Sequence, residues 1–258
     1  MSAVIPSQSA LAKLADATVG TATNNIDAKT PFTARLQLLH GPSKVRVDWN
    51  KDQGPKPDEG CFWVGPPGGA FMGLQFIAVP LAWRDHALQT KGETVMLESY
   101  NAPGLGQLPK TPDEDVFVAI KTAAANKKNQ VDKTLQNRVG KDVLLWIPAQ
   151  KQADPRWPGI TSGGKFAIYY LAGTAVPEAD NFRANFGRLV TVKSHEVNGK
   201  SFSWFVPEVT MHGDGSIDPT MLPDMAAAQD ELTKFANPIA KGEAMPKPAA
   251  EGVDGRAR

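Results

Sequence analysis

A series of short strand-like runs between about Phe32 and Thr210 is the feature that most constrains the fold of this chain. The runs read ARLQLLHG, KVRVDWN, GCFWVG, FMGLQFIAVPLAW, ETVMLESY, KDVLLWIPA, KFAIYYLAG, RLVTVKSHEV and KSFSWFVPEV. Gly, Pro and Asn separate them, and Asn198 with Gly199 predicts a two-residue hairpin turn between two alternating runs. A meander of short strands is typical of a β-barrel or a β-sandwich.

Helical patterns lie within and around this region. TPDEDVFVAIKTAAANKK, at 111–128, begins with a proline and an acidic first turn and ends with two lysines, which matches the helix dipole at both ends. PEADNFRANFG and SIDPTMLPDMAAAQDELTKFA predict two further helices. The predicted organisation is an N-terminal helix and linker at 1–30, a β-rich core at 31–212, a C-terminal helix at 213–237 and a flexible tail at 238–258.

Composition excludes several classes of protein. The 28 Lys and Arg against 27 Asp and Glu give a formal net charge of +1, so this is not a polycation that coats duplex DNA by charge alone. Any site for a polyanion must therefore be local. Cys61 is the only cysteine, which excludes an intrachain disulfide framework and a cysteine-cluster metal site. No run approaches the roughly 20 apolar residues of a membrane span, and the N-terminus lacks a secretion signal, so we expect a cytoplasmic protein without a membrane partner.

Motifs for catalysis or metal binding are almost absent. GITSGGKF, at 159–166, satisfies the G-x-x-x-x-G-K part of a phosphate-binding loop, but Phe166 replaces the Ser or Thr that binds Mg²⁺ and a strand-like run follows where a helix is required. A Gly-rich β-turn is the favoured interpretation. The four histidines, His40, His86, His195 and His212, lack metal-ligand spacing, and no nucleophile and base are paired. We expect no catalysis, no metal and no cofactor.

Large aromatic and basic residues are interleaved in three of the runs, FMGLQFIAVPLAWRDHAL, GKFAIYYLAG and GKSFSWFVPEV. Because neighbouring strand residues face opposite ways, Tyr169 and Tyr170 cannot both enter one core if the other side of the sheet is wet. Outward-facing aromatics beside Lys and Arg would form a stacking surface of the kind that holds single-stranded nucleic acid. The strand candidates for this surface are Trp83, Arg84, Lys165, Phe166, Tyr169, Tyr170 and Trp204.

Some of these residues have a purely structural alternative. Trp83 can instead be a core residue, with Arg84 solvated. A basic stretch follows Asp115, and it is either a solvated helix and loop or a mobile arm that closes over a nucleic-acid backbone. Its members are Lys121, Lys127, Lys128, Lys133, Arg138 and Lys141, of which Lys121, Lys127 and Lys128 are taken as binding candidates.

The order of the segments carries a resemblance to a known family. PFTARLQLLHGPSK, LQFIAVPLAWRDHAL, a helix, LLWIP, GKFAIYYLAGT and SFSWFVPEV follow one another between about residues 32 and 209. This order resembles a family of uncharacterised tailed-phage proteins that are regarded as candidate single-stranded-DNA-binding proteins with an OB-like core. The chain departs from the family at Asp85 and His86, where Pro-Lys is usual, at Thr174 and Ala175, and at Phe205, where His is common. It also ends in GVDGRAR, without the acidic tip through which many such proteins recruit partners.

The resemblance implies an OB-like β-barrel, decorated with two or three α-helices and flanked by flexible termini. The expected function is sequence-tolerant binding of single-stranded DNA in phage replication or recombination, in the cytoplasm of an infected bacterial host, with replication or recombination proteins as further partners. Two alternatives remain. One is a phage virion or assembly protein that binds no nucleic acid, and the other is a nucleotide-metabolism enzyme that uses the loop from Gly159 to Lys165.

Overall fold

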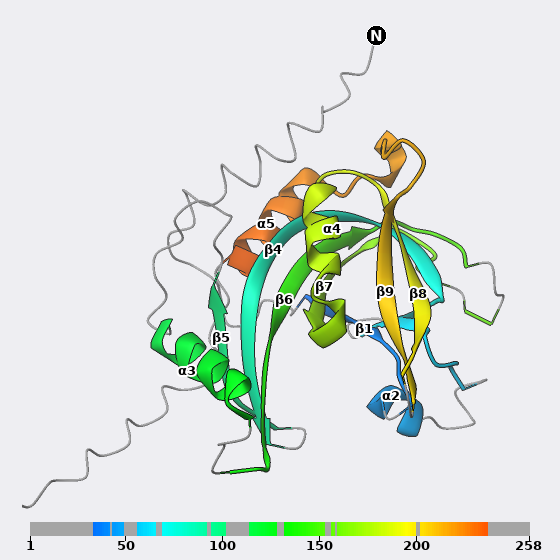
Figure 1. Ribbon diagram of the computed structural model, residues 1–258. Helices are drawn as coiled ribbons and strands as arrows, with labels where there is room; N and C mark the ends of the chain where they lie inside the picture. The colour runs from blue at the N-terminus through cyan, green and yellow to red at the C-terminus, as the bar shows by residue number, and fades with distance from the viewer. Residues whose placement is uncertain are drawn as a thin grey trace, which may run out of the picture.

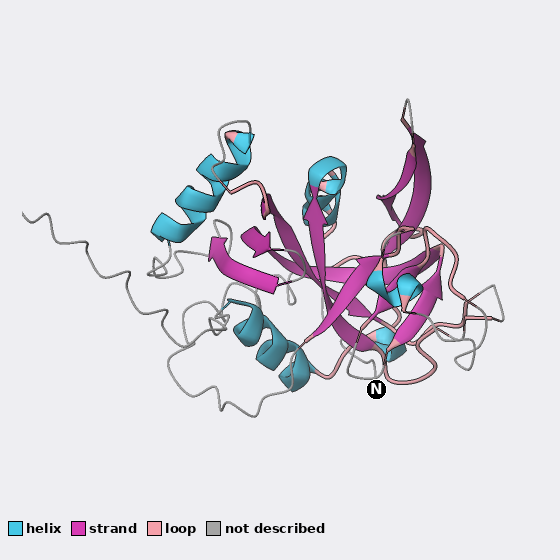
Figure 2. Cartoon of the chain, turned by 90° about the horizontal axis from the view of Figure 1, so that it is seen from below, coloured by secondary structure: helices cyan, strands magenta, loops and turns pink. Residues whose placement is uncertain are grey.

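The protein is mainly β in the computed structural model, which describes residues 33–41, 43–48, 56–65, 69–91, 94–101, 114–127, 132–152, 156–157, 159–199 and 202–236 (Figure 1). Within these ranges nine strands form one mixed, strongly curled half-barrel sheet. Figure 2 shows the strands in the middle of the molecule with the helices around them. The predicted N-terminal helix, the predicted tail and Lys128 lie outside the described residues.

The strand order combines a meander with long-range pairing. The strands are β1 (Ala34–Leu38), β2 (Phe62–Val64), β3 (Ala70–Gly73), β4 (Gln75–Lys91), β5 (Thr94–Asn101), β6 (Leu135–Ile147), β7 (Lys165–Ala172), β8 (Val190–Asn198) and β9 (Ser203–Met211). Their order across the sheet is β3-β2-β1-β7-β6-β4-β8-β9, and β5 pairs with β4. Neighbours are antiparallel except β1 and β7, which run parallel.

The 17-residue strand β4 gives the sheet its curl. Its first four residues pair with β8, the segment from Val79 onward pairs with β6, and the segment from Asp85 onward also pairs with β5. A bulge between Pro80 and Ala82 interrupts the pairing with β6. Since proline has no N–H to donate, it is tolerated in a sheet interior at such a bulge, where the strand bends.

Three of the four helices in the described residues lie where the sequence predicts a helix. The four helices are α2 (Lys44–Val47), α3 (Glu114–Ala125), α4 (Glu178–Ala184) and α5 (Met225–Ala236), with 3₁₀ turns η3 (Gly173–Ala175) and η4 (Pro219–Met221). The three longer ones fall inside the predicted helical segments. Within the described ranges, none of the helices combines the length and apolar character that crossing a membrane requires.

The prediction of a strand at KVRVDWN is wrong, because Lys44–Val47 forms the single turn α2. The Ser43 carbonyl accepts from the N–H groups of Arg46, at 2.8 Å, and Val47, at 3.0 Å. The Arg46 side chain donates to the Pro57 carbonyl at 2.9 Å and to Glu59 at 2.8 Å. These local contacts outweigh the strand preference of the two valines.

The predicted hairpin between β8 and β9 is present, but its turn is not at Asn198 and Gly199. Asn198 is still paired with Ser203, and the Gly199 N–H donates to the Phe202 carbonyl at 2.9 Å. Positions 200 and 201, which follow, lie outside the described residues. Pairing of the strands extends two residues further than the Asn-Gly signal indicates.

Side-chain alternation gives the sheet two apolar faces. The inner face packs against α4, with Trp83, Val143 and Tyr169 in one cluster with Phe182 of that helix. The outer face packs against α5 through a second cluster made of Val79, Leu81, Ala82, Leu144, Trp146, Leu189, Leu232 and Phe235. Figure 1 shows α4 inside the curl and α5 outside it. Burial on both faces explains why β4 and β6 read as nearly continuous apolar runs.

Candidate nucleic-acid interface

Two cations stand over the ring of Trp83 at the inner face. Lys141 Nζ, from β6, lies 4.1 Å from the ring centroid, and Arg183 Cζ, from α4, lies 5.5 Å from it. Trp83 itself is only 8% exposed, so it offers no open ring face on which a base could stack. Its π-system instead holds two basic side chains in place, since a cation over an indole ring is attracted by the ring quadrupole.

Lys121 of α3 belongs to the same surface. Lys141 Nζ lies 3.8 Å from Asp85 Oδ1. Burial raises the pKa of Asp85, while Lys141 and Lys121 act against that rise, which places both ammonium groups close to one half-buried carboxylate. Lys121 and Arg183 are exposed to solvent. Lys121 and Lys141 therefore act on the single acid Asp85, and Arg183 adds a third cation at the neighbouring Trp83 ring, in a chain whose net charge is only +1.

Two aromatic side chains are connected through η3 to the strand that carries Lys141. The end of β7, Ala172, pairs with Gly140, next to Lys141, and η3 follows directly. Trp204 Nε1, from β9, donates to Thr174 Oγ1 in η3 at 3.2 Å. The Phe202 ring, at the tip of the β8–β9 hairpin, lies 5.5 Å from the Trp204 ring and is 71% exposed.

These residues make up what we call the basic–aromatic surface: Lys121, Lys141, Arg183, Phe202 and Trp204. Figure 1 shows its carriers, α3 and the β8–β9 hairpin, on either side of α4. The surface thus combines positive charges with one exposed ring, that of Phe202, and one half-buried ring, that of Trp204, and charges and rings are the two kinds of group that hold a single strand.

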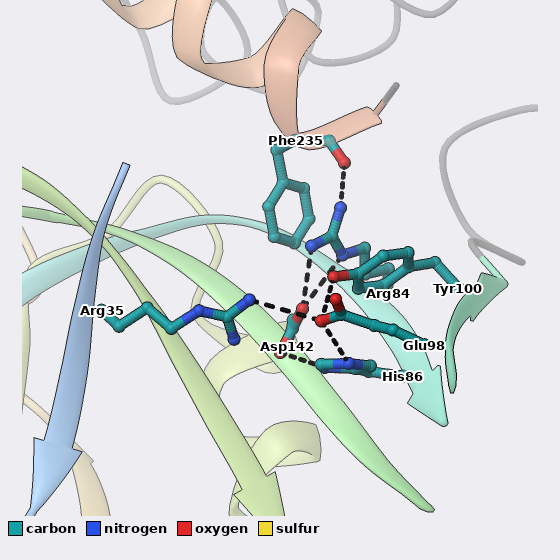
Figure 3. A network of polar contacts seen from close by, with 7 residues as sticks. All are labelled: Arg35, Arg84, His86, Glu98, Tyr100, Asp142 and Phe235. Atoms are coloured by element: carbon teal, nitrogen blue, oxygen red, sulfur yellow. Dashed lines mark hydrogen bonds and ion pairs between the residues drawn. The ribbon is translucent and has the colours of Figure 1, made fainter. Parts of the chain in front are cut away.

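Arg84, the neighbour of Trp83, points to the opposite face, where its guanidinium is bound by contacts within the protein (Figure 3). Its Nε and Nη2 donate to Asp142 Oδ2 at 3.1 and 2.9 Å, and its Nη1 donates to the Phe235 carbonyl at 2.6 Å. The guanidinium also lies 3.7 Å from the Tyr100 ring centroid and 4.3 Å from that of Phe235. With 3% exposure, Arg84 is a structural cation that ties α5 to β4 and β6, which does not fit the phosphate contact predicted for it.

His86 bridges two carboxylates beside this pair. Its Nδ1 lies 2.9 Å from Asp142 Oδ1, and its Nε2 lies 3.0 Å from Glu98 Oε1 as an ion pair off the line of a hydrogen bond. Glu98 also accepts from the Tyr100 hydroxyl and lies 3.5 Å from Arg35 Nη2. Figure 3 shows these side chains converging from β1, β4, β5 and β6. We call this set, Arg35, Arg84, His86, Glu98, Tyr100 and Asp142, the charged network.

The pKa values in the charged network follow from its pairing. Burial alone would raise the pKa of Asp142, but the contact with His86 and the charges of His86 and Arg84 outweigh it and hold the pKa low. Burial raises the pKa of Glu98 in the same way, and its contacts with His86, Tyr100 and Arg35 bring it down to about 2. Burial lowers the pKa of His86, but its two carboxylate partners raise that pKa more strongly, so the imidazolium form is favoured. Both carboxylates have cationic partners, and across the described residues no His, Cys, Asp and Glu side chains group as metal ligands.

Stability is therefore expected to fall on both sides of a weakly acidic optimum. The depressed pKa of Glu98 gives a contribution that is present above its ordinary value of 4.5 and is lost as the pH falls toward about 2. It amounts to about 2 kcal/mol once solvent screening is allowed for. The raised pKa of His86 gives a contribution that is complete below 6.5 and is lost as the pH rises through the folded-state value. Urea unfolding at closely spaced pH values would measure both limbs.

The variant His86→Gln tests whether His86 causes the alkaline limb. His40 cannot cause it, because burial lowers the pKa of His40 and a lowered histidine pKa affects stability with the opposite sign. The His86→Gln replacement should flatten the alkaline limb, and it should also reduce the acid limb, because His86 is one of the groups that lower the pKa of Glu98 and of Asp142. An alkaline limb of unchanged depth in His86→Gln would contradict the assignment to this histidine.

The remaining predicted residues are divided between the two faces. Tyr169 is 4% exposed in the inner core, whereas Tyr170 points outward, where its ring lies 4.8 Å from that of His86. Phe166 packs on Trp146 at 4.7 Å in the outer cluster. The two tyrosines thus alternate as the strand pattern predicts, and neither presents an exposed ring.

Lys165 and the Gly-rich loop do not form a phosphate-binding loop. The turn after Gly159 leads straight into β7, whose first residue is Lys165, so a strand begins directly after the loop where a phosphate-binding loop requires a helix. Gly164 has φ +84°, and a Cβ there would come within 2.4 Å of the Trp146 ring, which explains the glycine by packing. Lys165 is half-buried and burial lowers its pKa, while Lys127 is exposed just beyond α3.

Sequence reasoning did not single out Arg183 or the charged network. Arg84 and His86 are two residues apart on one face of a strand, and Asp142 comes directly before the apolar run VLLWI. An acid directly before such a run signals a buried ion pair, because a buried carboxylate requires a partner. That signal exists in the sequence, whereas the position of Arg183 over Trp83 depends on how α4 docks.

Comparison with known proteins offers no guide to this site: no protein-family model matches the chain, and no curated protein or solved structure shows significant similarity to it. The functional proposal therefore depends on the chemistry of the residues.

Proposed function

We propose that the protein binds single-stranded DNA with little sequence preference, through the basic–aromatic surface. The observation that carries this proposal is that two cations, Lys141 and Arg183, lie over the Trp83 ring on the same surface as Lys121. The exposed Phe202 and the half-buried Trp204, which bonds to η3, extend this surface with aromatic rings. Lysine and arginine contact phosphates without reading sequence, and aromatic rings stack on any base. Action in phage replication or recombination, in an infected bacterial cytoplasm, is part of the same proposal.

Strand connectivity supports an OB-like assignment of the barrel. β4, β6 and β7 form an antiparallel meander, α4 follows, and β8 and β9 form a hairpin whose first strand pairs back with the start of β4. A long bent first strand shared by two partners, with a helix before the last hairpin, is the plan of a five-stranded Greek-key barrel. In such barrels the loops after the first and fourth strands flank the oligonucleotide. Here they correspond to the segment with α3 and to the tip of β8–β9.

Binding would be tested by fluorescence anisotropy of labelled oligo-dT at two salt concentrations, with ATP as a control ligand. The variant Lys121→Ala/Lys141→Ala/Arg183→Ala should weaken binding and lower the salt slope by about 2, since each lost phosphate contact on a single strand accounts for about 0.7. A matched control is Lys193→Ala, which removes an exposed cation of β8. The same loss per charge removed in the control and in the triple variant would show that only net charge matters. Absence of oligo-dT binding by the wild-type protein would favour a virion or assembly role.

Stacking is tested separately at the hairpin tip. Phe202→Ala should lose about 1 to 3 kcal/mol of strand affinity, a factor of about 5 to 150, with the salt slope unchanged. Phe202 is 71% exposed, so the free energy of unfolding should stay within about 0.5 kcal/mol of wild type. Phe202→Trp, which keeps an aromatic ring, should retain binding. An affinity unaffected by Phe202→Ala would remove the tip from the interface.

A further inference from the structure

An open pocket lies at the start of β4, and none of its lining residues belongs to the basic–aromatic surface. It encloses about 500 Å³, within the range of small-ligand sites. Its walls come from the corner between β3 and β4, from residues 150–152 after β6, from Arg156 and Trp157, and from Asp58 and Cys61. Gly73, at φ +65°, makes the corner possible, because a side chain rarely adopts that backbone conformation.

The floor of the pocket is apolar and fixed. Phe76 is 2% exposed and Trp157 is 3% exposed, and Ile77 lies beside them. Gln150 locks this floor, because its Oε1 accepts from the Ile77 N–H and its Nε2 donates to the Ile77 carbonyl, both at 2.8 Å. Leu74, at the rim, is 53% exposed. A flat hydrophobic ring placed here would cover apolar surface that solvent now reaches.

The rim supplies two further kinds of group. Gln75 and Gln152 provide side-chain amides, and with the Gln152 amide turned so that its nitrogen faces the Gln75 carbonyl, that nitrogen donates to it at 2.9 Å. Lys151 is exposed, and Arg156 pairs with Asp58 at 2.9 Å while lying 5.3 Å from the Trp157 ring. Two cations against one acid leave the rim with an excess positive charge. The matching ligand has a planar ring with a hydrogen-bonding edge and carries an anionic group.

We propose that this pocket binds a single nucleotide, with the base over Leu74 and Ile77 and the phosphate beside Lys151 and Arg156. A free nucleotide and the 5′-phosphorylated end of a strand share this chemistry. The assignment goes beyond the proposed strand binding and does not depend on it.

Calorimetric titration of the full chain with dTMP, thymidine and inorganic phosphate tests the proposal. We expect saturable binding of dTMP at least tenfold tighter than that of thymidine or phosphate. Lys151→Ala/Arg156→Ala should abolish the advantage of dTMP over thymidine, and Leu74→Trp, which fills the rim from an exposed position, should abolish binding of both. Lys127→Ala is the matched control and should bind like wild type.

The source of the nucleotide is resolved in the Lys121→Ala/Lys141→Ala/Arg183→Ala background, where strand binding by the other surface is weakened. Preference for 5′-phosphorylated over unphosphorylated oligo-dT there identifies strand ends, and equal weak binding of the two identifies the free nucleotide. No saturable dTMP binding at millimolar concentration, or dTMP binding that Leu74→Trp leaves intact, would overturn the pocket assignment whatever the result with oligo-dT.

Discussion

Asp142→Ala is expected to lower the free energy of unfolding by about 3 to 5 kcal/mol, measured by urea denaturation near pH 6. Asp142 is fully buried, accepts two hydrogen bonds from Arg84 and contacts His86 Nδ1. Its removal leaves two cationic side chains buried without their shared counter-charge. The same change should loosen the end of α5, since Arg84 would no longer be held in position to donate to the Phe235 carbonyl.

The double replacement Arg84→Met/Asp142→Leu separates the cost of an orphaned charge from the value of the pair. Because apolar residues of similar volume can replace a buried ion pair at little cost, this variant should be much more stable than Asp142→Ala. Glu208→Ala, an exposed acid on β9, is the surface control and should change stability by less than about 0.5 kcal/mol. If Asp142→Ala and Glu208→Ala proved equally mild, the charged network would have no structural role.

Tyr169→Ala should destabilise the protein by about 3 to 5 kcal/mol, whereas the same change at its neighbour Tyr170 should cost clearly less. Tyr169 lies in the inner core, where its ring meets Phe62 at 6.2 Å and Phe182 at 6.4 Å in edge-on contacts. Tyr170 is half-buried against His86 on the other face. Thermal and urea unfolding of the two variants, compared with wild type, would measure the difference.

Tyr170→Phe gives a sharper version of this test. The Tyr170 hydroxyl is buried and has no hydrogen-bond partner among the described residues, and burial together with Asp142 raises its pKa to about 12. Removing an unsatisfied hydroxyl should be neutral or slightly stabilising. A loss above about 1 kcal/mol would mean that this hydroxyl has a partner.

Local pattern was enough to predict most elements of this fold. Strands β4, β6 and β7 could be predicted from the residues of their own segments, and so could helix α3 from its acidic start. The opposite facing of Tyr169 and Tyr170 follows from strand geometry alone. KVRVDWN misled because its helical turn is fixed by Ser43, Pro57 and Glu59, all of which lie outside the segment.

The candidate site was harder to predict because it depends on which face each strand presents. Trp83 and Arg84 were nominated together, yet adjacent strand residues diverge, and each is buried on its own side. Lys121 remained a candidate only because α3 docks on the same face as Lys141. No periodicity in the sequence reports such docking, so exposed positions such as Phe202 could be recognised only once the sheet had been assembled.

The parallel pairing of β1 with β7 has a consequence for the order in which the chain folds. Ala34 is registered with Ala167, so β1, which also pairs with the nearby β2, can complete its pairing only after the meander β4–β6–β7 has formed. Contacts between residues so distant in sequence are made late and slow the folding of β-rich chains. Until β1 docks, one edge of β7 presents unpaired N–H and C=O groups, a template for wrong pairing between chains. During synthesis, therefore, β1 leaves the ribosome well before the strand beside which it finally lies, and the unclosed edge of β7 is where we expect aggregation to start.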